Sequence, residues 1–261
     1  MVDVQSRADA RSIAIQKAGV KDMRVPLRVK DQTGAVQHTI GHFTMTVNLA
    51  QERKGVHMSR FPELLNALDS EISYSMFCGL LLNMVGRLEA DAGHIEVTFP
   101  YFVGKTAPVS RVRSLMDYEV NLAGDVIEGK TRVSVRVVIP VTSLCPCSKE
   151  ISEFGAHNQR SHITITATTN GLLWIEDLIR LAEDESSCDI YALLKRADEK
   201  YVTERAYDNP KFVEDTVRDL AAQLAQDKRV SAFTVECENF ESIHNHSAYA
   251  RIDHPSELTH N

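Results

Sequence analysis

The stretch from Ser143 to His162 concentrates side chains that can do chemistry. Its twenty residues include two cysteines, two histidines, two carboxylates and two basic side chains. A thiolate and a neutral imidazole are ordinary ligands of zinc-like divalent metal ions. Cys145 with His157, or Cys147 with His162, could supply one ligand of each kind.

The spacing of the cysteines indicates an open metal site rather than a closed one. Cys145 and Cys147 form a Cys-x-Cys pair, which differs from the Cys-x-x-Cys of zinc knuckles and redox pairs, and no second pair follows. Further ligands must therefore come from elsewhere in the chain, with room left for water, as in catalytic zinc sites. The alternative is a polar loop whose thiols are incidental.

Composition narrows the class of protein. The 261 residues are 43% hydrophobic and 25% charged, an ordinary globular balance. A net charge of -7 argues against nucleic-acid binding, although a local basic pocket for a small anion is compatible with it. The five scattered cysteines favour a reducing compartment, and no signal peptide or run of ~18 apolar residues is present. We therefore expect a cytoplasmic protein.

Hydrophobic periodicity predicts an α+β fold built from two similar halves. Residues 1–24 are interpreted as a flexible N-terminal arm, with a short helix over 8–17. The first half, 25–125, is expected to contain a hairpin that turns at 31–34, two helices and two further strands. The second half, 126–261, repeats strands and helices in a similar order. The expected helices are 61–68, 71–89, 174–182, 189–203 and 213–224, and the later strands are 95–101, 112–122, 133–137, 162–168, 233–237 and 248–252.

Five segments in this order closely resemble the type IB GTP cyclohydrolase family. They are Gly55-Val-His-Met-Ser-Arg60, Ser143-Leu-Cys-Pro-Cys-Ser-Lys149, Gly155-Ala-His-Asn-Gln-Arg160, Thr203-Glu-Arg-Ala-Tyr-Asp-Asn-Pro210 and Glu241-Ser-Ile-His-Asn-His246. The resemblance extends from about Val56 to Tyr249. It implies paired tunnelling-fold (ββααββ) modules with antiparallel sheets and helices on one face, which assemble into barrels across the subunits of a homotetramer with sites at subunit interfaces.

The resemblance also implies a metal site. The positions that match metal ligands are Cys145, His157, Glu199 and His244, a donor set that suits one divalent zinc, manganese or iron ion. Read without the resemblance, Glu199 is an ordinary exposed helix carboxylate, Glu204 is a rival for its role, and His244 and His246 are structural histidines. Cys147, if the segment is extended, points to the face opposite Cys145 and is a second thiol or a proton donor.

Substrate-binding residues follow from the same resemblance. Glu214 matches the carboxylate that accepts hydrogen bonds from the guanine edge, and the alternative is a helix-terminal acid that interacts with the helix dipole. Basic side chains are candidates for the triphosphate, although each alone reads as a surface base. These are His57 and Arg60, and also Lys54, Lys149 and Arg160.

The expected function is metal-dependent hydrolysis of GTP to 7,8-dihydroneopterin triphosphate and formate, with Cys145, Cys147, Glu241 and His244 as catalytic candidates. The product would enter tetrahydrofolate synthesis or the synthesis of a modified tRNA base such as queuosine. Two alternatives are another tunnelling-fold enzyme that acts on a pterin or deazaguanine through a cysteine nucleophile, and a non-catalytic metal-binding or thiol-switch protein.

Overall fold

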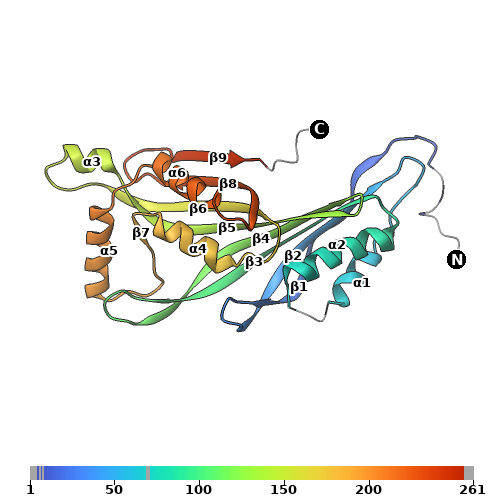
Figure 1. Ribbon diagram of the computed structural model, residues 1–261, viewed down its shortest axis with the longest axis horizontal. Coiled ribbons are helices and arrows are strands. Elements are labelled where there is room, and N and C mark those ends of the chain that lie inside the picture. Colours follow the sequence, from blue (N-terminus) through green and yellow to red (C-terminus); the bar gives the residue numbers. More distant parts are fainter. Residues whose placement is uncertain (1–4, 6, 8, 69–70, 256–261) are drawn as a thin grey trace. The chain divides into compact units, whose positions relative to one another are not determined.

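The computed structural model describes residues 5, 7, 9–68 and 71–255. Its strands form one sheet, hydrogen-bonded in the order β1-β2-β3-β4-β5-β6-β8-β9, with β7 paired to β5 (Figure 1). The β1–β2, β2–β3, β5–β7 and β8–β9 pairs are antiparallel. The strands are β1 (Ile15–Lys30), β2 (Val36–Leu49), β3 (Ala92–Thr106), β4 (Arg113–Ile127), β5 (Lys130–Leu144), β6 (Asn158–Thr169), β7 (Cys188–Asp189), β8 (Val230–Asn239) and β9 (Ala248–His254). The helices are α1 (Arg60–Asn66), α2 (Tyr74–Leu88), α3 (Pro146–Ile151), α4 (Ile175–Asp184), α5 (Arg196–Asp208) and α6 (Val213–Leu224). The α+β class and the mainly antiparallel sheet are confirmed.

The chain divides into two compact units that are not contiguous in sequence. Unit 1 comprises residues 1–99, 121–134 and 169–172, and unit 2 comprises residues 100–120, 135–168 and 173–261. The expected modules, 25–125 and 126–261, are contiguous segments and so differ from these units. Two complete ββααββ modules and their barrels stay predictions.

Unit 1 contains the predicted hairpin, which begins earlier than expected. Asp31 Oδ1 accepts hydrogen bonds from the backbone N–H groups of Thr33 and Ala35, both at 2.9 Å, and Gly34 supplies the positive φ of 89° that the turn requires. Residues 15–24, expected to belong to the arm and its short helix, lie in β1 and pair with β2. The arm's residues 1–4, 6 and 8 lie outside the described residues.

Helices α1 and α2 lie side by side in unit 1 (Figure 1). The apolar face of α2 is buried at three-four spacing, as its sequence predicts. Gly124 of β4 permits close packing, since a Cβ there would lie 2.6 Å from Leu81 Cδ1 and 2.9 Å from Phe77 Cε1. The core of unit 1 includes Phe43, Met45, Phe77, Leu81, Met84, Ile95 and Val97.

Unit 2 carries most of the candidate site residues. Helix α6 packs on β8 and β9, while α4 and α5 contact β7. The central strands bury alternate side chains, which fixes the face to which each polar residue points. The core includes Tyr101, Tyr118, Val137, Ile139, Ile163, Ile165, Leu178, Leu220 and Val235. No helix in the described ranges is long and apolar enough to cross a membrane.

Candidate functional site

Cys145 stands between the end of β5 and the start of α3. It is the N-cap of α3, and its Sγ accepts a hydrogen bond from Ser148 N at 3.5 Å, with Pro146 in the first turn. Its backbone N–H donates to His157 O at 3.2 Å. The loop between them therefore closes, and the two residues at its ends are neighbours.

The ring of His157 faces two acceptors. Its Nδ1 lies 2.9 Å from Gln159 Oε1 and 3.7 Å from Glu241 Oε2. The side chains of His157 and Glu241 are only 12% and 11% exposed. Phe240 N donates to Arg160 O at 3.1 Å, which ties the segment after β8 to β6. Cys145, His157 and Glu241 thus belong to one locality.

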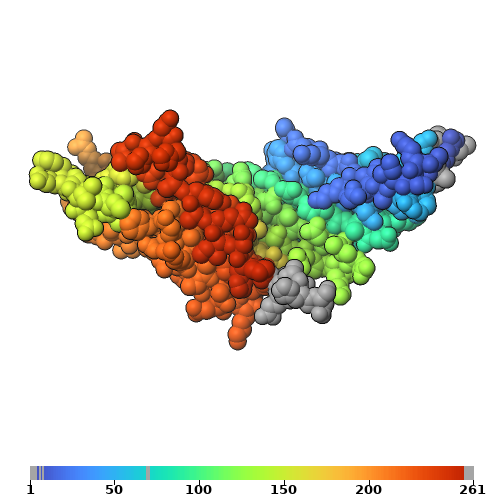
Figure 2. Space-filling model, turned by 90° about the horizontal axis from the view of Figure 1, so that it is seen from above, coloured from blue at the N-terminus to red at the C-terminus, as the bar shows by residue number. Residues whose placement is uncertain are grey.

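The same proximity is visible at the surface of unit 2. Figure 2 shows the yellow-green segment that contains α3 beside the red segment that follows β8. His162, the alternative imidazole, packs edge-on against Phe240 with ring centroids 4.8 Å apart. Burial and the charge of Arg160 hold the pKa of His162 below its usual value. The ring of His162 thus packs on Phe240, whereas the ring of His157 faces Glu241.

The other two predicted metal ligands are exposed. Glu199 lies on the surface of α5, and His244 is stacked on His246 with centroids 5.3 Å apart. Glu204, the rival of Glu199, forms an exposed pair with Lys200. Within the described part of the chain, no group of three or more His, Cys, Asp and Glu residues is arranged to hold a metal ion. The four-residue ligand set therefore stays a prediction. Of its residues, Cys145 and His157 are the pair that the described part of the structure places side by side.

Cys147 does not lie in an extended segment, so the argument that it points to the face opposite Cys145 is wrong. It is an exposed residue of α3, because Cys145 and Pro146 begin a helix there. Lys149, on the same helix, donates to the carbonyl oxygen of Tyr207 and lies 4.3 Å from the centre of that ring. This contact holds α3 against the last turn of α5. It also means that Lys149, a candidate phosphate ligand, already interacts with Tyr207.

Glu214 is exposed in the first turn of α6, as its place in the sequence suggested. The segment before the helix is tied to β5, since Lys211 N donates to Leu144 O at 3.3 Å. Leu144 directly precedes Cys145. The start of α6 is therefore fixed to the end of the strand that carries the cysteine.

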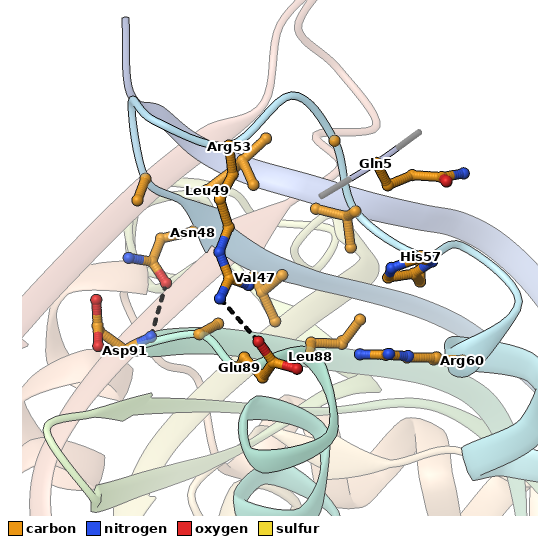
Figure 3. Close-up of a pocket in the computed structure, with 14 residues that line it drawn as sticks. Gln5, Val47, Asn48, Leu49, Arg53, His57, Arg60, Leu88, Glu89 and Asp91 are labelled. Carbon is orange, nitrogen blue, oxygen red and sulfur yellow. Dashed lines mark hydrogen bonds and ion pairs between the residues drawn. The ribbon is translucent and has the colours of Figure 1, made fainter. Parts of the chain in front are cut away.

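His57 and Arg60 line a pocket of about 110 Å³ in unit 1 (Figure 3). Arg60 Nη1 donates to Arg87 O, at the end of α2, while Arg53 forms an ion pair with Glu89 at 2.8 Å. The pocket is small compared with sites of about 300–1,000 Å³ that enclose whole ligands. Its size suits one phosphate group rather than a nucleotide.

A set of buried polar residues behind His157 was not predicted. Gln159, Ser143, Ser161 and Asn239 are each at most 9% exposed and hydrogen-bonded to one another. The available signal was spacing: Gln159 and Ser161 follow His157 at intervals of two, so the three side chains share one face of a strand.

Comparisons with known proteins define first the class of fold and then the family. The chain superposes on the crystal structure of uricase from Arthrobacter globiformis with a TM-score of 0.54, over 94% of this chain and 95% of that one, at 7% identity. A hyper-thermostable mutant of that uricase gives a TM-score of 0.51 at 8% identity. The class of fold is therefore uricase-like.

The family is shown by sequence. Residues 1–250 match the family model for type I GTP cyclohydrolase FolE2. The chain is 61% identical over 251 residues to a protein of Methylobacillus flagellatus named GTP cyclohydrolase FolE2, covering 96% of this chain and 94% of that protein. It is 62% identical over 253 residues to the GTP cyclohydrolase FolE2 of Nitrosospira multiformis, covering 97% and 96%. The chain belongs to the type I GTP cyclohydrolase FolE2 family.

Proposed function

We propose that this protein hydrolyses GTP to 7,8-dihydroneopterin triphosphate and formate, with one water consumed overall, as a GTP cyclohydrolase I of type IB. The observation that carries the proposal is the meeting of Cys145, His157 and Glu241 at the ends of β5, β6 and β8, in a chain of this family. The product would be the first pterin on the route to tetrahydrofolate. Supply of a modified tRNA base is a second use of the same product.

We propose that Cys145 and His157 bind a divalent zinc, manganese or iron ion, with Glu199 and His244 as further ligands. The thiolate and imidazole of neighbouring residues are a suitable donor pair. A metal ion bound there would lower the pKa of a water molecule and so supply hydroxide at neutral pH.

The protein's own groups orient the substrate and move protons. Glu214 would accept the guanine N1–H and 2-amino hydrogens, while His57 and Arg60 would bind a phosphate in the unit 1 pocket. Glu241 Oε2, held 3.7 Å from His157 Nδ1, would act as a general acid or base close to the His157 ring. His244 and Cys147 would be further acid–base groups. We also propose a cytoplasmic homotetramer with its sites at subunit interfaces.

The test is an assay of pure protein with GTP, first stripped of metal and then resupplied with manganese, zinc or iron. Formate and the fluorescence of oxidised neopterin should appear together and only with metal. Cys145→Ala should abolish both signals, whereas Cys78→Ala, which changes a thiol of unit 1, should leave them unchanged. Absence of formate with every metal would remove the proposal and favour a related enzyme that acts on a pterin or deazaguanine.

A further inference from the structure

A continuous row of hydrogen bonds leads from the interior of unit 2 to the ring of His157. Gln159 Nε2 lies 2.9 Å from Ser143 Oγ, which lies 2.8 Å from Ser161 Oγ. Ser161 Oγ is in turn 2.7 Å from Asn239 Oδ1. These residues come from β5, β6 and β8, which are neighbours in the sheet. At its outer end, Gln159 Oε1 lies 2.9 Å from His157 Nδ1.

The chemistry of the groups fixes the direction of each hydrogen bond. Asn239 Oδ1 can only accept, and a serine hydroxyl has one hydrogen, so the hydrogen of Ser161 goes to Asn239. Ser143 must then donate to Ser161. Ser143 Oγ in turn accepts from the amide nitrogen of Gln159, which leaves the amide oxygen of Gln159 facing His157.

Cys237 contacts the inner end of the row. Its Sγ lies 3.6 Å from Asn239 Oδ1, and burial raises the pKa of the thiol to about 12, so it remains an S–H donor at neutral pH. Asn239 Oδ1 thus faces two groups that can donate to it, the thiol of Cys237 and the hydroxyl of Ser161.

We propose that this row, through Gln159 as a positioning residue, holds His157 in the tautomer with hydrogen on Nδ1 and keeps the Nε2 lone pair free. Two acceptors face Nδ1, Gln159 Oε1 at 2.9 Å and Glu241 Oε2 at 3.7 Å, and both favour an N–H there. Nε2 can then bind a metal ion or accept a proton without any change of tautomer. The link to metal binding rests on the proposed function, whereas the tautomer itself does not.

The tautomer can be measured directly in the metal-free protein. Histidine labelled with ¹⁵N is introduced into the full chain, and correlation spectra between ring carbon-bound hydrogens and ring nitrogens are recorded well above the ordinary imidazole pKa. Among the ten histidines, the signals lost in His157→Gln identify His157. We expect a protonated Nδ1 in the wild type and in Gln159→Glu, whose carboxylate also accepts.

Gln159→Leu should shift His157 toward the tautomer with hydrogen on Nε2. A wild-type ring protonated on Nε2, or a ring in Gln159→Leu that is the same as in the wild type, would overturn the proposal. If Gln159→Leu does not fold, Ser161→Ala replaces it: a mixture of tautomers supports the proposal, and an unchanged ring overturns it.

Zinc titration of the same proteins gives the second measurement. Gln159→Leu should bind zinc about 10–100-fold more weakly than the wild type, the usual effect of losing a partner of a ligating histidine. The matched control is Thr164→Val, which removes a buried hydroxyl from the same strand and should leave zinc affinity unchanged. A loss of affinity in the control equal to that in Gln159→Leu would overturn the assignment to Gln159. A wild type that binds no zinc would instead remove the metal part of the proposed function, and the nitrogen spectra would still decide the tautomer.

Discussion

The ammonium group of Lys105 lies between two carboxylates in the interior of unit 2. Its Nζ is 2.8 Å from Glu183 Oε1 and 2.6 Å from Asp189 Oδ2, and it lies 4.5 Å from the centre of the Tyr191 ring. Lys105 is 9% exposed, and Tyr118 also donates to Glu183 at 2.8 Å. A buried charge of this kind depends on its counter-ions far more than a surface charge does.

We expect Lys105→Met to reduce the free energy of unfolding by about 3–5 kcal/mol, because it leaves two carboxylates without their cation. Urea denaturation measures the change. The control is Lys200→Met, which breaks the exposed pair with Glu204 and should cost at most about 1 kcal/mol. Equal losses in the two variants would contradict the buried role of Lys105.

The cost of Lys105→Met should depend on pH. Burial raises the pKa of Glu183, and Lys105 opposes that shift. A carboxyl whose pKa is raised by folding contributes stability below its ordinary pKa and loses it as the pH rises through the folded value. Without Lys105 the pKa of Glu183 rises further, so the free energy of unfolding lost in Lys105→Met should be smaller at about pH 5 than at about pH 8. If the stability lost in Lys105→Met did not depend on pH, the loss would arise from packing alone.

At the residue scale, the proximity of two candidate residues could be predicted where one short segment contains both of them. Cys145 and His157 stand at the two ends of one loop, so their proximity follows from a strand pair with a short connection. Gln159 was missed, because an amide has no reactive group and its role arises only through Ser143 on another strand. Glu199 and His244 rest on the resemblance alone.

At the scale of elements, one carboxylate docks α5 on the connection between β3 and β4. Asp198 is fully buried and accepts hydrogen bonds from Val109 N, Ser110 N and Lys195 N, each at 2.8 Å, and from Ser110 Oγ at 2.5 Å. Burial alone would raise the pKa of Asp198, but these hydrogen bonds hold it below its ordinary range. The helix that carries Glu199 is thereby fixed at its first turn.

Asp198→Asn should lower the melting temperature by about 3–10 °C, because an amide nitrogen cannot accept from Lys195 or from the Ser110 hydroxyl. Scanning calorimetry checks this value. Asp208→Asn, an exposed change at the other end of α5, should be neutral or slightly stabilising at the negative end of the helix dipole. A neutral Asp198→Asn would show that the docking is not needed.

The C-cap of α2 is a second element-level test. Glu89 adopts a left-handed conformation with φ of 52°, which glycine tolerates better than any other residue. Glu89→Gly should therefore raise the free energy of unfolding by about 0.5–1 kcal/mol, since its exposed pair with Arg53 contributes little. Glu89→Ala keeps a Cβ and should show no gain in urea denaturation. Equal stability of the two variants would contradict the argument from conformation.

Most elements followed from periodicity, and the exceptions have physical causes. The hairpin turn and α2 have strong local signals, namely Asp31 with Gly34 and a buried three-four pattern. The start of β1 was missed because residues 15–24 are mostly exposed and therefore lack alternation. Helix α3 was missed because its six residues include none that is buried, so no apolar period marks it.

At the scale of the whole molecule, two features of the surface support the proposed self-association. The end strands of the sheet are β1 and β9, and β1 is 16 residues long. An end strand of this length can pair with another chain where it is not covered, and in the part of the chain that the structure describes Ile72 bridges its edge at Val29. Phe154 is 98% exposed and Ile151 is 83% exposed in the loop region around α3.

We expect light scattering on a sizing column to give a mass that is a multiple of 29.2 kDa, with four subunits as the proposed number. Phe154→Ser should weaken the association and lower the average mass on dilution. A mass of one chain for the wild type at every concentration would contradict an assembly.

The interleaved composition of the two units has a consequence for synthesis on the ribosome. Unit 1 includes residues 169–172, so it cannot be complete until these have left the exit tunnel, by which time residues 100–120 and 135–168 of unit 2 have already emerged. Domains whose segments are contiguous can fold one after the other as they are made. Here strands of both units must remain partly unpaired in the growing chain at the same time. Because β8 and β9 are synthesised last, the strands of unit 2 remain so for longer.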